Sequence, residues 1–354
     1  MTAADRADMP ACMAYKAFIA GCSGPDLTED ERAFLRDQRP CGLILFARNC
    51  VSRDQVKNLT ESARACCGDE MLVLVDQEGG RVQRMGPPEW RAYPPARAFA
   101  RLYAQNEEEG LRAAHLVTRL MAEDLYELGI DTDCAPVLDV PVAGAHEIIG
   151  DRSYGDDAET IIALGRIVAE SLLESGVLPV IKHVPGHGRA RVDSHKELPV
   201  IDAPLEELES VDFKPFAALA DMPLAMTAHV VLRAFDEEAP ATVSPFIMQE
   251  VIRRQIGFKG LIMSDDLNMS ALSGEPEDRA KAVLGAGCDV VLHCSGVYAD
   301  MVRVADAVPM LSDEGQTRFQ AARDRLQEPA PYDRDEALQM CEKVSRSGSE
   351  QRKS

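Results

Sequence analysis

Short apolar runs rich in β-branched residues alternate along the chain with longer stretches in which apolar residues recur every three or four positions. The short runs have the length and composition of buried strands, and the longer stretches have the period of amphipathic helices. Eight runs fit strands, at residues 16–21, 42–46, 71–76, 132–139, 178–183, 224–229, 260–264 and 290–293. This alternation predicts βα units, and eight of them favour a single closed (β/α)8 TIM-type barrel of the α/β class over an open doubly wound sheet.

Polar residues mark where the helices between these strands begin. Thr28 to Glu31 and Ser52 to Gln55 each have the spacing of a capping box. The clearest apolar stripe runs from Glu107 to Leu128. Further helices are expected over 158–175, 205–219, 245–255 and 276–286.

The chain shows no sign of a division into two large domains. No stretch rich in Pro, Gly or Ser interrupts the alternation of strands and helices. We therefore expect one barrel catalytic domain over residues 1–327. Residues 328–354 contain two prolines and a polar end, and we expect one further helix there and then a frayed tail.

The balance of charge excludes two classes of partner. The chain has 59 acidic and 38 basic side chains, which gives a net charge of -21. Such a surface repels the phosphate backbone of nucleic acid and anionic lipid. Lys and Arg are dispersed and form no basic stripe. We therefore expect no nucleic-acid partner, and a small neutral or zwitterionic ligand stays open.

Cysteine usage and the N-terminal sequence bear on location. The ten cysteines are scattered, and no CxxC pair suggests a zinc ribbon or a redox motif. Reduced, buried thiols are typical of the cytoplasm. The first residues carry acids where a secretory signal needs bases, and no run approaches the roughly 20 apolar residues that span a bilayer. We expect a cytoplasmic protein without a membrane partner, acting as a monomer, with no cofactor or metal.

Polar side chains gather directly after five of the predicted strands. In (β/α)8 enzymes the catalytic groups stand past the carboxyl ends of the strands. For any one acid after a strand, a helix cap is the plainer explanation. The five clusters together indicate a functional site, and they are Asp76 to Arg84, Asp139, Lys182 to Gly188, His229, and Ser264 to Asp266.

The segment from Ile181 to His195 holds three of the seven histidines. Pro185 and its neighbouring glycines exclude a helix and indicate a loop. An imidazole titrates near neutrality, and a carboxylate neighbour such as Asp193 would orient it and favour its charged form. Two alternatives stay open here: a zinc site made by His183, His187 and His195, which lacks the helical H-E-x-x-H spacing, or histidines that only brace the loop.

Four motifs together resemble a known enzyme family. They are Asp76-Gln-Glu-Gly-Gly-Arg-Val-Gln-Arg84, Ile149-Gly-Asp-Arg-Ser-Tyr-Gly155, Lys182-His-x-Pro-Gly-His-Gly188 with Asp193-Ser-His195, and Ser264-Asp-Asp-Leu-Asn-Met269. In this order they are similar to the family 3 glycoside hydrolases, and within them to the bacterial β-N-acetylglucosaminidases of peptidoglycan recycling. The match extends over roughly residues 10 to 325.

The resemblance implies an activity and a set of site residues. It implies a retaining exo-glycosidase that removes terminal non-reducing β-linked N-acetylglucosamine from muropeptide fragments, through a covalent intermediate on Asp265. It makes His195 the acid/base with Asp193 as its dyad partner. It assigns sugar binding to Asp76, Arg84, Arg152, Lys182 and His183. Asp266 is then a helix cap beside the nucleophile.

The chain also departs from the family pattern. The usual Phe before Pro-Gly-His-Gly is Val184 here, and the usual Asp-Thr after it is Arg189-Ala190. These changes remove no catalytic group, but they bear on how the loop moves and on contacts to the leaving group.

Alternatives to this mechanism remain at the level of the sequence. Catalysis by the substrate's own acetamide needs an acid pair, and Asp131 with Asp133 lies at a strand start rather than a strand end. A metal-dependent barrel hydrolase and a β-glycoside phosphorylase on the same site stay open. A sugar sensor that kept the pocket is disfavoured, because binding alone requires no nucleophile.

Overall fold

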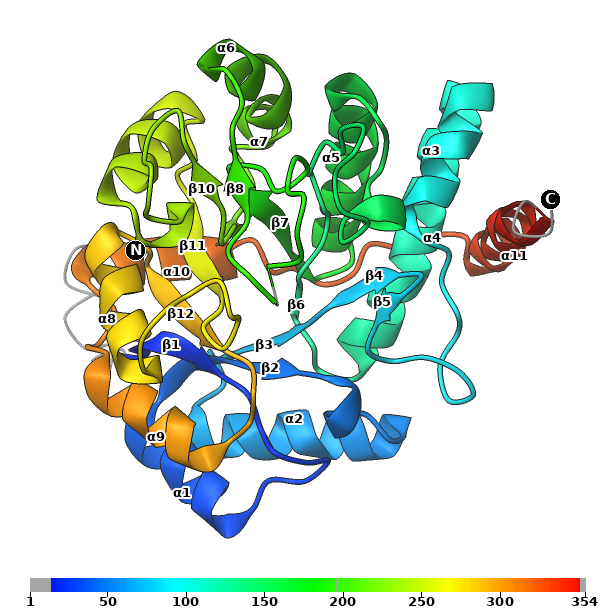
Figure 1. The fold of residues 1–354 in the computed structure, drawn as a ribbon. Helices are drawn as coiled ribbons and strands as arrows, with labels where there is room; N and C mark the ends of the chain where they lie inside the picture. The colour runs from blue at the N-terminus through cyan, green and yellow to red at the C-terminus, as the bar shows by residue number, and fades with distance from the viewer. Residues whose placement is uncertain (1–13, 195, 351–354) are drawn as a thin grey trace, which may run out of the picture.

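The computed structural model describes residues 14–194 and 196–350. Eight parallel strands close into a barrel with the order β1-β12-β11-β9-β7-β6-β3-β2 (Figure 1). The strands are β1 (Lys16–Ala20), β2 (Pro40–Leu45), β3 (Leu72–Val75), β6 (Thr132–Asp133), β7 (Leu178–Val184), β9 (Leu224–Thr227), β11 (Leu261–Asp266) and β12 (Val290–His293). Each corresponds to one of the eight predicted runs, and the predicted barrel is confirmed.

The predicted strand over 132–139 is much shorter in the structure. Pairing with β7 stops after Asp133, and Val137 returns only as an isolated bridge to Lys182. Pro136 explains the break, because it has no amide hydrogen to donate to a neighbouring strand. The apolar pattern continues beyond this point because the segment remains buried, although it no longer pairs as a strand.

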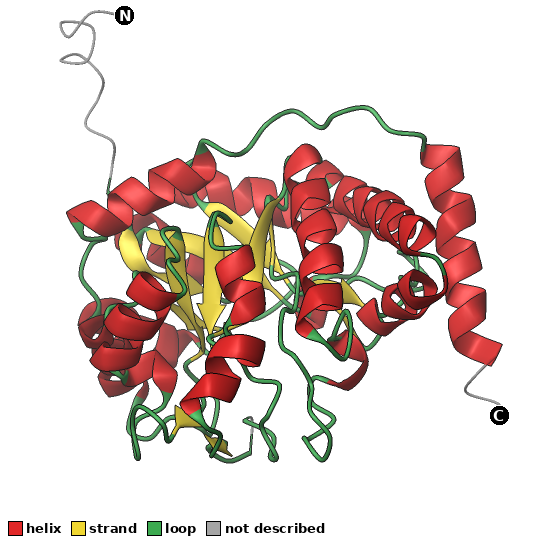
Figure 2. Ribbon diagram, turned by 90° about the horizontal axis from the view of Figure 1, so that it is seen from above, coloured by secondary structure: helices red, strands yellow, loops and turns green. Residues whose placement is uncertain are grey.

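Helices lie around the ring of strands (Figure 1), and the view from above shows them on both flanks of the strands, with loops gathered at one end (Figure 2). The α-helices are α1 (Glu29–Gln38), α2 (Arg53–Cys67), α3 (Ala96–Gln105), α4 (Glu107–Glu127), α5 (Ala158–Glu174), α6 (Leu205–Glu207), α7 (Lys214–Ala218), α8 (Pro276–Ala286), α9 (Tyr298–Ala307), α10 (Asp313–Arg323) and α11 (Arg334–Glu350). The predicted helix over 205–219 is divided into α6, a wide π-type turn η3 (Leu208–Asp212) and α7. The prediction for 245–255 corresponds to a second π-type helix, η5 (Ile247–Gln255).

The first helix starts as predicted and the second only in part. At Thr28 both bonds of the capping box form, with Glu31 N donating to Thr28 Oγ1 at 3.1 Å and Thr28 N donating to Glu31 Oε2 at 2.8 Å. At Ser52 the hydroxyl accepts from Gln55 N at 3.4 Å. The Gln55 side chain accepts from Val51 N instead of closing the box.

Small elements shape the carboxyl end of the barrel. A hairpin follows β3 and consists of β4 (Gln77–Gly79) and β5 (Val82–Gln83). A second small sheet pairs β8 (Val200–Ile201) with β10 (Val231–Leu232). Three 3₁₀ turns complete the described elements, η1 (Ala47–Asn49), η2 (Gly150–Arg152) and η4 (Ala241–Val243).

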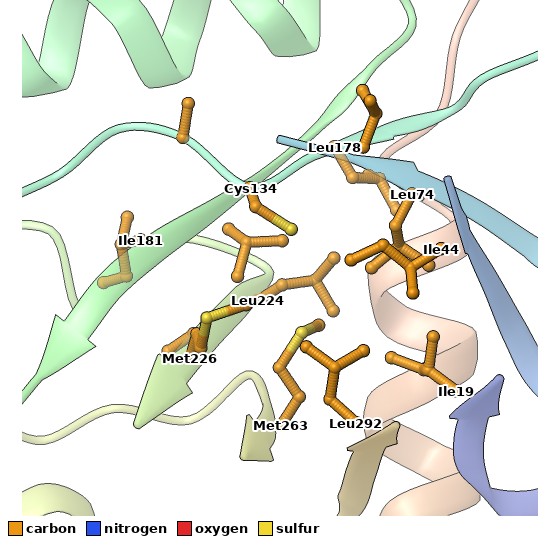
Figure 3. Packing of buried hydrophobic residues seen from close by; sticks show 14 of the residues in the cluster. Ile19, Ile44, Leu74, Cys134, Leu178, Ile181, Leu224, Met226, Met263 and Leu292 are labelled. Carbon is orange, nitrogen blue, oxygen red and sulfur yellow. The ribbon is translucent and has the colours of Figure 1, made fainter. Parts of the chain in front are cut away.

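Side chains from several strands fill the inside of the barrel. Ile19, Ile44, Met263 and Leu292 come from β1, β2, β11 and β12 and lie close together in the close-up (Figure 3). Each of these four is at most 1% exposed. The interior is therefore a packed core rather than a pore, and polar groups gather at its carboxyl end.

The last helix packs on the barrel's outer layer. α11 lies beside α4 and also contacts α3 (Figure 1). Ala337, Cys341 and Val344 on its inner face are buried. The helix expected beyond residue 327 therefore exists, and the expected frayed end, from 351, lies outside the described residues. No helix in the described part of the chain is long and apolar enough to cross a membrane.

Candidate active site

A cavity of about 240 Å³ opens at the carboxyl end of the barrel. It is smaller than the roughly 300–1,000 Å³ typical of pockets for drug-sized ligands, so it suits one sugar ring. The structure brings into its wall Asp265 together with all five residues predicted to bind sugar, Asp76, Arg84, Arg152, Lys182 and His183. The wall also includes Ile44, Phe46, Arg81, Val82, Ile148, Ile149, His187, Ser194, Met226, Asp266, Leu292 and Cys294.

Cations and carboxylates alternate along one side of this cavity, and all of them except Glu78 line it directly. Lys182 Nζ lies 2.8 Å from Asp76 Oδ1 and 2.6 Å from Glu78 Oε1. Arg84 Nη2 donates to the other Asp76 oxygen at 2.8 Å. Arg152 donates to both Glu78 oxygens, each at 2.8 Å. We call this set, Arg84, Asp76, Lys182, Glu78 and Arg152, the charge cradle.

The charge cradle keeps all its members ionised. Burial raises the pKa of Asp76 and Glu78, but the cations outweigh it: Lys182 and Arg84 hold the pKa of Asp76 well below its usual range. Arg152 and Lys182 lower the pKa of Glu78 to about 2. Burial lowers the pKa of Lys182, but the two carboxylates raise it above its usual value. The side chains therefore keep fixed charges in a largely dry site.

Glu78 is the member of the charge cradle that sequence reasoning missed. The residue lies on β4, two positions after Asp76, and its side chain is 5% exposed. The sequence did contain a hint of a second acid, because the predicted sugar-binding set had three cations and a single carboxylate, Asp76. Buried charges are paired, so a second acid was needed nearby, and Glu78 was the acid inside the same motif.

Two histidines of the segment after β7 share one buried carboxylate. His183 Nδ1 lies 2.7 Å from Asp139 Oδ2, and His187 N donates to Asp139 Oδ1 at 2.7 Å. Asp139 thus fixes the His183 ring, a role that the strand-end cluster alone did not reveal. Burial lowers the pKa of His187 to about 4, so its imidazole is neutral at pH 7. Its Nε2 atom lies 3.1 Å from Ser194 Oγ.

Asp265 stands on β11 and faces the cavity. It accepts a hydrogen bond from Asp266 N at 2.8 Å. Burial raises the pKa of Asp265, but His229, His183 and the Asp266 amide together lower it below its ordinary value. The carboxylate is therefore ionised at neutral pH, as a nucleophile must be.

Asp266 and His229 are fixed by bonds that support Asp265. Asp266 Oδ1 accepts from Asn268 N at 3.1 Å and from Cys294 N at 3.1 Å, so this carboxylate caps a turn and ties it to the end of β12. His229 lies 2.8 Å through Nδ1 from Thr242 Oγ1 and 3.1 Å through Nε2 from the Asp266 carbonyl. Both ring nitrogens are thus engaged, which fixes the imidazole beside the predicted nucleophile.

The predicted dyad is placed only in part. Asp193 lies in a turn where Lys196 N and Glu197 N donate to its carbonyl at 2.8 and 3.1 Å. Its neighbour Ser194 lines the cavity. His195, the predicted acid/base, lies outside the described residues.

Two alternative sites can be compared with the geometry. Within residues 14–194 and 196–350 no group of three His, Cys, Asp or Glu side chains could hold a metal ion, and the third histidine of the zinc alternative is His195. Asp131 binds Arg64 at 2.8 Å, and Asp133 accepts from Gln77 N at 2.9 Å. Neither acid lines the cavity, so they are not placed to orient an acetamide there.

The comparison with protein families decides the class. Residues 13–328 match the N-terminal domain of glycosyl hydrolase family 3. The chain belongs to this family. A β-hexosaminidase of Methylococcus capsulatus is 40% identical over 303 residues, which cover 84% of this chain and 89% of that protein. One of Bordetella parapertussis is 38% identical over 277 residues, which cover 77% and 78% of the two chains.

Solved family 3 structures have the same fold. Native NagZ from Neisseria gonorrhoeae is 34% identical, has a TM-score of 0.76, and is matched over 88% of this chain and 97% of its own. The same enzyme has been solved with N-trifluoroacetyl-D-glucosamine. A β-N-acetylglucosaminidase of Paenibacillus is 27% identical with a TM-score of 0.83, and this chain covers 66% of its length. The family resemblance read from the four motifs is confirmed.

Proposed function

We propose that this family 3 glycoside hydrolase, a β-N-acetylhexosaminidase, releases terminal non-reducing β-linked N-acetylglucosamine from peptidoglycan (muropeptide) fragments with retention of configuration. The observation that carries the proposal is one ionised carboxylate, Asp265, in a one-sugar cavity whose other acids are held by partners. Asp76 is bound by two cations, and Asp266 accepts two backbone amides. Asp265 is therefore the acid best placed to react.

The reaction would run as a double displacement. Asp265 attacks the anomeric carbon and forms a glycosyl ester, while His195 gives its proton to the leaving oxygen. Asp193 would favour the charged imidazole before this step. His195 would then take a proton from water, and the hydroxide formed would release the sugar from Asp265.

The charge cradle would hold the sugar's hydroxyl groups. Asp76 is an acceptor, and Arg84, Arg152 and Lys182 are donors whose directions their mutual bonds fix. Asp139 holds His183 through Nδ1, which leaves Nε2 available for a hydrogen bond with a substrate hydroxyl. Binding in a fixed orientation would bring the anomeric carbon to Asp265.

The deciding experiment traps the intermediate. A 5-fluoro glycosyl donor should label wild-type protein at Asp265, found by peptide mass mapping, because fluorine slows the second step. Asp265→Asn should not be labelled and should lose at least about 1,000-fold in kcat. Asp266→Asn is the matched control and should still be labelled at Asp265. A label on another residue, or none, contradicts the double displacement.

Two assays separate the remaining alternatives. Hydrolysis of 4-nitrophenyl N-acetyl-β-D-glucosaminide should exceed that of the glucoside and should give free sugar in phosphate buffer; sugar 1-phosphate would indicate a phosphorylase. NagZ from Neisseria gonorrhoeae has also been solved with a zinc ion. Activity that survives a chelator would exclude the metal-dependent alternative, and loss restored by zinc would support it.

We further propose that the protein works as a monomer in the cytoplasm. The nine described cysteines are all free thiols, which suits a reducing compartment. The barrel itself supplies Asp265 and all five predicted sugar-binding residues of the cavity wall. Light scattering and cell fractionation test these two points.

A further inference from the structure

An arginine fixes the base of the segment that follows β7. Arg189 donates from Nε to Asp212 Oδ2 at 2.7 Å and from Nη1 to Glu207 Oε2 at 2.9 Å. The Arg189 side chain is 14% exposed and that of Asp212 is 2% exposed. Burial raises the pKa of Asp212 to about 6, so the pair is charged on both sides at neutral pH. Two directed charge-assisted bonds, one to the buried Asp212 and one to the exposed Glu207, hold the backbone from which the guanidinium extends.

The opposite side of the same stretch is pressed against the segment that follows β6. A Cβ added at Gly188 would lie 1.9 Å from the Val140 carbonyl oxygen, so only glycine fits there. His146 N donates to the Ala190 carbonyl at 2.8 Å. Residues 187–190 are therefore held from two sides, by η3 and α6 on one and by residues 139–146 on the other. We call this stretch and its contacts the loop clamp.

The turn that carries Asp193 begins where the loop clamp ends. Asp193 follows Arg189 by four residues. Ser194, the residue after Asp193, has its Oγ 3.1 Å from His187 Nε2, and further along the chain Val231 N donates to the Pro199 carbonyl at 2.9 Å, beside β8. The turn is thus joined to the loop clamp on both sides of Asp193.

We propose that Arg189, through Asp212 and Glu207, is a positioning residue for proton transfer in the active site. It fixes the start of the turn on which Asp193 stands, and it touches neither the sugar nor Asp265. The inference rests on the proposed function, because that function assigns the proton transfer to this turn. None of the five charge-cradle residues lies within 187–190, so we expect Arg189 to act on proton transfer more than on sugar binding.

This division of roles can be tested in a way that distinguishes a positioning residue from a general loss of structure. A leaving group of low pKa departs without much help from an acid, whereas a sugar alcohol needs the proton. Arg189→Ala should therefore lower kcat/KM about 100-fold for N,N′-diacetylchitobiose and about tenfold or less for the 4-nitrophenyl glycoside. The inhibition constant of free N-acetylglucosamine, which reports sugar binding, should stay within about threefold. Arg189→Lys should recover part of the lost kcat/KM, because lysine keeps the positive charge but cannot make both directed bonds of the guanidinium.

The matched control is Arg233→Ala. Arg233 pairs with Asp202 at 3.1 Å, and both side chains are more than half exposed, at 54% and 75%. An exposed pair of this kind contributes little, so the control should behave as the wild type on both substrates. An equal loss on both substrates, or an inhibition constant that rises with it, overturns the proposal.

Hydrogen–deuterium exchange tests the loop clamp without activity. Peptides within 187–199 should exchange faster in Arg189→Ala than in Arg233→Ala, and equal exchange overturns the loop clamp. If Arg189→Ala does not fold, Arg189→Lys and Asp212→Asn replace it. For both we expect the same preference, with a smaller difference between the losses of kcat/KM on the two substrates. A wild type that hydrolyses neither substrate refutes the proposed function instead, and the exchange result still decides on the loop clamp.

Discussion

Each side chain of the charge cradle is held in place by another polar side chain. Lys182 is 1% exposed and stays charged only because Asp76 and Glu78 lie within 2.8 Å of its ammonium group. Taking one member away leaves the others buried without a partner, which costs more than the removed bond contributed. Substitutions in the charge cradle should therefore affect folding and sugar binding together.

Glu78→Gln tests this coupling. Removing one partner of a buried ion pair typically costs about 3–5 kcal/mol, so the free energy of unfolding at pH 7 should fall by about 3 kcal/mol and KM should rise about tenfold or more. Glu209→Gln is the control, since Glu209 is exposed and accepts from Gln255 on the surface at 2.6 Å. Equal stability of the two variants would contradict the role of Glu78.

The pH dependence of stability gives a second measurement on the same residue. The folded pKa of Glu78 is lowered from 4.5 to about 2, so its contribution is present above about pH 4.5 and is lost as the pH falls toward 2. Between pH 6 and 2.5 the free energy of unfolding, measured with denaturant, should fall more steeply in the wild type than in Glu78→Gln. Parallel curves would show that Glu78 is not ionised in the folded protein.

At this scale the sequence predicted which residues gather but not how they pair. Charged residues after apolar strands indicated the place, because strands of a parallel barrel end on one face. The partners were harder, since Glu78 and Asp139 bind residues 104 and 44 positions away. Such pairing depends on which strands are neighbours around the barrel, which the residue pattern does not contain.

At the level of whole elements, the apolar period placed all eight barrel strands and misjudged where pairing stops. The segment 132–139 was predicted as one strand because burial continues past Pro136, where the ladder breaks. The helix predicted over 205–219 is interrupted at η3, where Asp212 turns inward to Arg189. The first difference has a local cause, since Pro136 has no amide hydrogen for the ladder, and the second arises where a tertiary contact overrides the local helical pattern.

The two predicted capping boxes provide a measurable contrast between elements. Thr28→Ala removes a complete box and should lower the free energy of unfolding by about 1 kcal/mol. Ser52→Ala removes one longer bond, at 3.4 Å, and should cost about half as much. Denaturant unfolding of the two variants measures this, and a larger loss at Ser52 would contradict the geometry of the caps.

Considered as a whole molecule, the barrel depends on its last helix. Val344 is 2% exposed where α11 packs along α4. Val344→Asp would place an unpaired charge in that contact and should lower the melting temperature by several degrees or more, since about 1 kcal/mol corresponds to roughly 2–4 °C in a large domain. Arg346→Ala, on the exposed face, should leave it unchanged. An unchanged melting temperature for Val344→Asp would show that α11 adds nothing to the fold.

The charge cradle and Asp265 together set three cations against three carboxylates in a sheltered space. A descendant of this chain that exchanged one of the six for a neutral residue would inherit an uncompensated charge at the centre of its barrel. We therefore expect these six charges to change in compensating pairs or not at all, and new substrate preferences to come from the loops around them.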